Sequence, residues 1–183
     1  MQRFTDIAHT WLAETIAYGD CVVDATLGNG HDALFLAQQI GASGQLFGFD
    51  VQKQAMEASQ ALLANEPCCQ HLVLAGHETM LEHIPQEIHG KIQAIMFNLG
   101  WLPGSDKSVV THADTTILAL EQSLELLAPD GRMTVMLYPG HQGGDTEAQQ
   151  VITWATQQQL LHIEQITLPN RPKAPILLQA TKF

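Results

Sequence analysis

Short, largely apolar runs and amphipathic stretches alternate along almost the whole chain. Apolar runs bounded by turn residues are typical of buried strands, and seven occur, at residues 21–26, 46–50, 71–75, 92–98, 133–138, 161–167 and 176–180. Apolar side chains at helical spacing predict amphipathic helices at residues 5–17, 32–40, 53–65, 114–128 and 145–158. The last two strands follow each other with only the loop 168–175 between them.

This order of elements predicts the fold class. Strands that alternate with helices form a mostly parallel sheet covered by helices on both faces. Two strands with no helix between them indicate a terminal antiparallel hairpin. We therefore expect an α/β, Rossmann-like fold with a seven-stranded sheet. A length of 183 residues is typical of one domain, here spanning 1–183.

The most informative motif lies where the first strand ends. Asp24 is followed by a turn containing Gly28 and Gly30, and a second strand ends at Asp50. A strand, a glycine turn and an acid about 20 residues later are the parts of an adenosine-cofactor site. The glycines admit the cofactor close to the backbone, and Asp50 can accept hydrogen bonds from ribose hydroxyls. The alternative is a structural turn, with Asp50 as a helix cap.

The charge of this turn indicates which cofactor it binds. Asp24 and Asp32 flank the glycines, and an acidic lining disfavours the pyrophosphate of NAD. It suits the cationic sulfonium of S-adenosylmethionine, whose product is S-adenosylhomocysteine. After the third strand, His77 either contacts the adenine base or caps a short helix that begins at Glu78.

The loop after the fourth strand carries the candidate chemistry. Asn98 ends that strand, and side chains at the carboxyl ends of strands line the crevice of an open α/β sheet. Its amide and a nearby backbone carbonyl can accept hydrogen bonds from an amine and so align the nitrogen lone pair for in-line displacement. Trp101 can stack on a flat base. The alternative is an ordinary loop with a buried tryptophan.

Two further loops, residues 138–144 and 170–175, are expected at the same rim. Lys107, Arg171 and Lys173 would form a basic patch for phosphates there, or are merely solvated loop charges. His141 would accept the proton of the product ammonium, or only line the wall. The other histidines, His9 among them, are scattered along the sequence and are assigned no chemistry.

Composition limits the partners. The net charge of −11, with 8 Lys and Arg, argues against tight non-specific binding of nucleic acid but leaves an RNA substrate open. Three cysteines, two of them adjacent, suggest no disulfide framework, and no spacing indicates a metal site. Without a signal peptide or an apolar run long enough to span a membrane, a cytoplasmic location is expected.

Together these motifs resemble a known family. The residues are 24–32, 76–78, 98–104, 138–144 and 171–175, and the set is similar to the small bacterial class I methyltransferases labelled rRNA methylases. The resemblance implies an S-adenosylmethionine-dependent enzyme that acts on tRNA. It would methylate the aminomethyl group of the wobble uridine, in the anticodon region, to give methylaminomethyl uridine. The family usually has Tyr at position 101, and its members are dimers.

The residue predictions follow from the motifs and the resemblance together. Catalytic roles are expected for Asn98, Gly100 and His141. Cofactor contacts are expected from Asp24, Thr26, Gly28, Asn29, Gly30, Asp32, Asp50, Gln52, His77, Glu78 and Asn98. Substrate contacts are expected from Trp101, Leu102, Pro103, Lys107, Tyr138, His141, Arg171 and Lys173. The rival functions are methylation of rRNA or a small-molecule amine, an NAD-dependent oxidoreductase, and a non-catalytic RNA-binding module.

Overall fold

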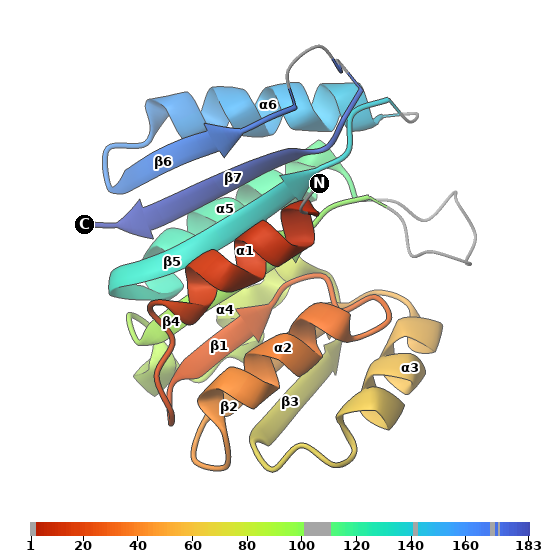
Figure 1. The fold of residues 1–183 in the computed structure, drawn as a ribbon, viewed down its shortest axis with the longest axis vertical. Coiled ribbons are helices and arrows are strands. Elements are labelled where there is room, and N and C mark those ends of the chain that lie inside the picture. Colours follow the sequence, from red (N-terminus) through yellow and green to blue (C-terminus); the bar gives the residue numbers. More distant parts are fainter. Residues whose placement is uncertain (1–2, 101–110, 141–142, 169–170, 172) are drawn as a thin grey trace.

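The structure is a computed structural model that describes residues 3–100, 111–140, 143–168, 171 and 173–183. Its centre is a seven-stranded sheet in the order β3-β2-β1-β4-β5-β7-β6 (Figure 1). The strands are β1 (Cys21–Asp24), β2 (Gln45–Asp50), β3 (Cys69–Leu74), β4 (Ile92–Asn98), β5 (Leu127–Leu137), β6 (Leu161–Ile166) and β7 (Ile176–Lys182). The helices are α1 (Phe4–Ala13), α2 (His31–Ile40), α3 (Lys53–Leu63), α4 (Met80–His83), α5 (Ala113–Leu126) and α6 (Gly144–Gln157), with short 3-10 helices η1 (His77–Thr79) and η2 (Gln86–Ile88).

The pairing of the strands confirms the predicted fold class. Neighbouring strands from β3 to β5 run parallel. β7 pairs antiparallel with both β5 and β6, which makes the terminal hairpin. The strand order reverses between β1 and β4, and an open α/β sheet binds its ligands at such a switch point, beyond the carboxyl ends of the strands.

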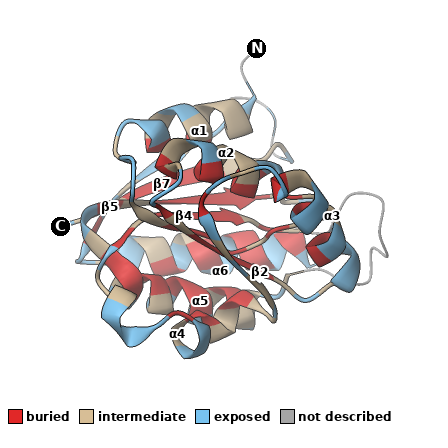
Figure 2. Ribbon diagram, turned by 90° about the horizontal axis from the view of Figure 1, so that it is seen from below, coloured by how far each residue is buried: buried red, intermediate tan, exposed pale blue. Residues whose placement is uncertain are grey.

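Helices cover both faces of the sheet (Figure 2). Successive residues of β4 show why, because side chains alternate between the faces of a strand. Ala94 and Met96 join a core beneath α1, α2 and α3. Ile95 and Phe97 join the core beneath α4, α5 and α6. Buried on both faces, the central strands have the largely apolar sequences that mark parallel strands.

Most boundaries lie within two residues of the prediction, and two differ by more. The first helix ends at Ala13 rather than at residue 17, because the chain turns there and the Asp20 carboxylate accepts the Ala17 N–H. The fifth strand begins six residues earlier than the predicted 133, because Leu127 already pairs with Ile92. The Pro-Asp-Gly turn then interrupts that ladder, with Asp130 at φ +61°. None of the described helices is long and apolar enough to cross a membrane.

Candidate active site

Asp24 lies at the centre of the site, at the carboxyl end of β1. It is fully buried, and one carboxylate oxygen accepts the Thr26 N–H at 3.0 Å. The other oxygen, Oδ2, has no hydrogen-bond partner among the described residues. Burial, together with the charges of Asp32 and Asp50, raises the pKa of Asp24 well above its ordinary value. An unpartnered buried acceptor of this kind suits a ligand that carries N–H donors or positive charge.

The glycine turn is tied to β2 through Asp50. Its Oδ2 accepts the Gly28 N–H at 2.9 Å, and its Oδ1 accepts the Gln52 N–H at 2.9 Å. Asp50 therefore holds the turn after β1 and the start of its own loop at the carboxyl end of β2, and each oxygen keeps a second lone pair for a hydroxyl hydrogen bond. Thr26 joins the turn to β4, since its Oγ1 accepts the Asn98 N–H at 2.7 Å.

Gly30 has a packing role that the cofactor motif did not predict. It adopts a left-handed conformation (φ +82°) as the N-cap of α2. A Cβ at this position would lie 2.9 Å from both the Cα and the Oγ of Ser59 on α3. The glycine thus lets α2 begin directly against α3, which brings the N-terminus of α2, with its half-exposed neighbour Asn29, to the edge of the site.

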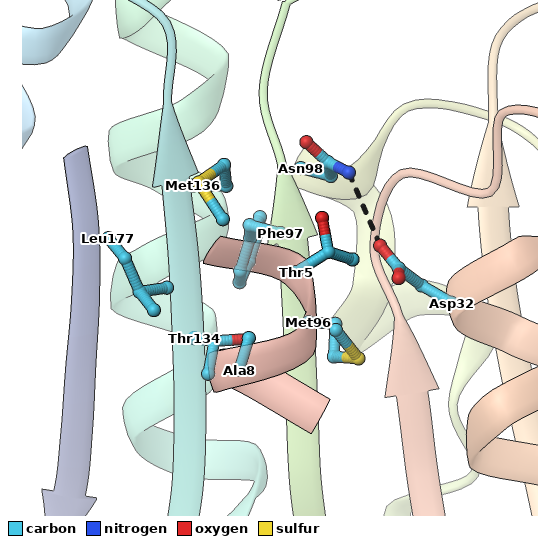
Figure 3. A pocket seen from close by; sticks show the side chains of 9 residues that line it. All are labelled: Thr5, Ala8, Asp32, Met96, Phe97, Asn98, Thr134, Met136 and Leu177. Atoms are coloured by element: carbon cyan, nitrogen blue, oxygen red, sulfur yellow. Dashed lines mark hydrogen bonds between the residues drawn. The ribbon is translucent and has the colours of Figure 1, made fainter. Parts of the chain in front are cut away.

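Asn98 and Asp32 form the polar contact next to the cavity shown in Figure 3. The Asn98 Nδ2 donates to Asp32 Oδ2 at 3.3 Å. A carboxylate can only accept, so the amide must present its nitrogen to Asp32. The Asn98 oxygen consequently points away from Asp32 (Figure 3). This leaves an oriented acceptor at the carboxyl end of β4.

His9 meets the same carboxylate from α1. Its Nε2 lies 2.7 Å from Asp32 Oδ1, a role that no sequence motif predicted for His9. The contact joins residues 23 positions apart across the tertiary fold, and no local spacing signals it. Thr5 and Ala8 of the same helix line the cavity with Asp32 and Asn98, so α1 forms one wall of the site.

His77 is buried against the first turn. Its Nδ1 lies 3.3 Å from the Ala25 carbonyl oxygen and must donate to it, which leaves Nε2 as an acceptor with no partner among the described residues. Burial lowers the pKa of His77 below its ordinary value, so the ring is neutral at neutral pH. His77 is the first residue of η1 and Gly76 its N-cap, so the alternative of a capping role for His77 is wrong. Glu78, half-buried, follows in η1.

Gly100 is held by a hydrogen-bond network that the sequence motifs did not predict. Its N–H donates to Thr111 Oγ1 at 3.0 Å, and the Thr111 N–H donates back to the Gly100 carbonyl at 3.0 Å. Thr111 and Thr116 each donate a hydroxyl hydrogen bond of 2.8 Å to the buried carboxylate of Glu147 on α6. Gly100 and Thr111 are therefore fixed to each other.

Tyr138 and the terminal loop reach the same rim. Burial and the nearby Asp32 carboxylate raise the pKa of the Tyr138 hydroxyl, which keeps it a hydrogen-bond donor. The side chain of Lys173 passes about 3.2 Å from the position of a Cβ on Gly140, so the two rim loops lie side by side as predicted. Arg171 is exposed near it in sequence. Trp101, Leu102, Pro103, Lys107 and His141 lie outside the described residues.

The arrangement combines acidic groups, unpartnered acceptors and an oriented amide oxygen at one sheet edge. It can bind a cationic ligand at Asp24 and hold an amine at Asn98. In the described part of the chain, no group of three or more His, Cys, Asp or Glu side chains is placed to hold a metal ion.

Comparison with known proteins identifies relatives over most of the chain. Residues 46–182 match the family described as "Putative rRNA methylase". A protein of Arabidopsis thaliana named "tRNA (mnm(5)s(2)U34)-methyltransferase, chloroplastic" is 33% identical, over 97% of this chain and 68% of its own length.

Two crystal structures are similar throughout. One, named "putative rRNA-methylase", comes from Clostridium thermocellum; it is 34% identical with a TM-score of 0.93, covering 100% of this chain and 99% of its own. The other is a "putative methyltransferase" from Streptococcus mutans in complex with S-adenosylhomocysteine. It is 29% identical with a TM-score of 0.87, again covering 100% of this chain and 99% of its own.

Proposed function

Because the chain belongs to the rRNA methylase family, we propose that it methylates the aminomethyl nitrogen of the wobble uridine of tRNA, giving methylaminomethyl uridine. The type of reaction follows from the family and from the solved relatives: the chain is an S-adenosylmethionine-dependent methyltransferase. The tRNA acceptor is supported by the name of the Arabidopsis relative, and the oriented amide at the site supports an amine as the group that is methylated.

S-adenosylmethionine supplies an electrophilic methyl group on a sulfonium sulfur. The residues present fit such a cofactor, since Asp24 Oδ2 and His77 Nε2 are buried acceptors without partners among the described residues. We assign Asp24 and Asp32 to its positively charged part and Asp50 to the ribose hydroxyls. His77 would accept from the adenine amino group. The backbone of the turn Thr26–Gly30 and the neighbouring Gln52 and Glu78 would complete the contacts.

The observation that carries the proposed reaction is the orientation of Asn98. Its nitrogen is committed to Asp32, so its oxygen is the group available to an incoming amine (Figure 3). An amine N–H that donates to this oxygen, and a second that donates to the Gly100 carbonyl, would leave the nitrogen lone pair directed at the methyl group. Such alignment contributes more to an in-line displacement than a strong base does.

The acceptor's phosphates would meet the rim. Lys173 lies against the loop after β5, and Arg171 is exposed near it in sequence. Two cations on a chain of net charge −11 provide local rather than general attraction for RNA. Tyr138 can add a neutral donor to the same rim.

The test is methyl transfer from labelled S-adenosylmethionine to tRNA taken from cells that lack this enzyme. The nucleosides are then resolved by mass spectrometry. Ribosomal RNA and small amines serve as parallel acceptors. The expected product is methylaminomethyl uridine in tRNA alone. Intact binding of S-adenosylhomocysteine with no transfer to tRNA would refute the tRNA assignment, and transfer to rRNA or to an amine would identify the correct acceptor.

A further inference from the structure

We propose that His9 is a positioning residue of this methyltransferase, which holds Asp32 so that the Asn98 amide keeps its oxygen toward the acceptor nitrogen. The inference rests on the proposed function, because it concerns the residue that we expect to align the amine. It assigns a role to α1, which lies outside the glycine turn and the strand ends.

The contacts form a chain of three side chains from three different elements. His9 Nε2 on α1 lies 2.7 Å from Asp32 Oδ1 on α2. Asp32 Oδ2 lies 3.3 Å from Asn98 Nδ2 at the end of β4. Because the carboxylate can only accept, both neighbours must donate, whichever charge state the imidazole has. The two donors occupy one oxygen each, which stops the carboxylate from turning.

The histidine ring is itself held in place. It stacks on Phe35 of α2, with the ring centroids 4.0 Å apart and the planes 3° from parallel. Phe35 is one helical turn beyond Asp32, so a single face of α2 supports the ring and receives its hydrogen bond. The His9 side chain is 24% exposed and that of Asp32 is 9% exposed, which makes the contact less screened than a surface pair.

Loss of the His9 donor should therefore change the orientation of the Asn98 side chain. The Asp32 carboxylate would retain one donor and could rotate about its side chain. The Asn98 amide would then lose its single orientation, and its nitrogen rather than its oxygen could face the amine. A misplacement of about 1 Å in an active site costs on the order of 100-fold in rate, so a partial loss of order should cost roughly 10- to 100-fold.

Two substitutions separate the hydrogen bond from the packing. His9→Phe keeps a ring on Phe35 but removes the donor. His9→Gln loses the ring but keeps an amide N–H that can reach Asp32. The matched control is His162→Phe on β6, which removes a similar histidine–carboxylate contact, that of His162 with Glu164 at 3.4 Å, at an exposed site.

The kinetic outcome is a split between kcat and KM. With S-adenosylmethionine at a saturating concentration, we expect His9→Phe to lower kcat for tRNA roughly 10- to 100-fold, with KM for tRNA little changed. His9→Gln should recover most of kcat, and His162→Phe should match the unsubstituted protein. An unchanged kcat in His9→Phe, or an equal loss in His9→Gln and His9→Phe, would overturn the proposal.

A second readout does not depend on the acceptor. The Asn98 side-chain amide gives an NMR signal, identified by its absence in Asn98→Ala. We expect this signal to shift and broaden in His9→Phe and to be restored in His9→Gln. An unmoved signal in His9→Phe would refute the positioning role. If the signal moves as expected but no tRNA is methylated, the proposed function fails while the role of His9 in holding Asn98 stands.

Discussion

The close approach of Gly30 to α3 allows a stringent test of the packing. In Gly30→Ala, the new Cβ must adopt the left-handed backbone of φ +82° and would lie 2.9 Å from the Cα of Ser59. Only a shift of the backbone, at residue 30 or in α3, can relieve that contact, because a Cα cannot rotate away. The substitution therefore combines a conformational cost with a packing cost.

The magnitudes can be estimated separately. A non-glycine residue in the left-handed region costs roughly 1–2 kcal/mol, and forcing extra volume into a packed site costs roughly 1–3 kcal/mol. The expected loss in Gly30→Ala is then about 2–5 kcal/mol. For a chain of this size, each kcal/mol lowers Tm by roughly 2–4 °C, so Tm should fall by at least about 4 °C.

Gly90 provides the matched control. It has φ +73°, and a Cβ there would meet nothing within 4 Å, so Gly90→Ala incurs only the conformational cost of roughly 1–2 kcal/mol. Thermal unfolding of the three proteins at one pH compares them. We expect Gly30→Ala to lose clearly more stability than Gly90→Ala. Equal losses would refute the argument that α2 and α3 meet at this glycine.

Three further predictions follow from buried polar groups. Burial lowers the pKa of His77, so as the pH falls below 6.5 the unfolded chain binds a proton more readily than the fold does, and the free energy of unfolding decreases. His77→Gln should make this decrease between pH 7 and pH 5.5 less steep, by up to about 1.4 kcal/mol per pH unit, as measured by urea unfolding. Because burial makes Asp24 costly to ionise, the ligand-free fold loses stability as pH rises above 3.8. Asp24→Asn should therefore raise Tm at pH 8 but weaken binding of S-adenosylmethionine. Unchanged affinity of this variant by calorimetry would contradict the assignment of Asp24 to the cofactor. Thr111→Val removes an acceptor from Gly100 and a donor from Glu147 and should cost about 1–3 kcal/mol in urea unfolding, whereas Thr115→Val, whose hydroxyl only bonds the His112 carbonyl, should cost less.

Much of the fold could be predicted because the strands are nearly continuous apolar runs. Buried on both faces, a strand such as Ile92–Asn98 differs clearly from the periodic helices around it. The early start of β5 could not be predicted, since Leu127 reads as the end of a helix. Its pairing with Ile92 depends on a strand 35 positions earlier.

The site residues that belong to one sequence motif could be predicted, whereas those brought together only by the tertiary structure could not. Asp24, Gly28 and Asp50 lie at strand ends or in a glycine turn, and the structure brings them together. His9 reaches Asp32 because α1 and α2 pack over the same core on one face of the sheet. Glu147 reaches Thr111 from α6, 36 positions along the chain. Contacts of this kind have no local periodicity.

The role proposed for Asn98 that matters most for the reaction is the alignment of the amine. The most direct measurement compares Asn98→Ala with the unsubstituted protein in single-turnover methyl transfer to tRNA, alongside calorimetric binding of S-adenosylhomocysteine. Gln93→Ala is the matched control, because Gln93 lies on the same strand and bonds Thr15 at 2.8 Å. With S-adenosylmethionine at a saturating concentration, we expect a loss of roughly 100-fold in the rate for Asn98→Ala, with S-adenosylhomocysteine still bound and Gln93→Ala unaffected. Methyl transfer by Asn98→Ala at the rate of the unsubstituted protein would show that Asn98 does not align the amine.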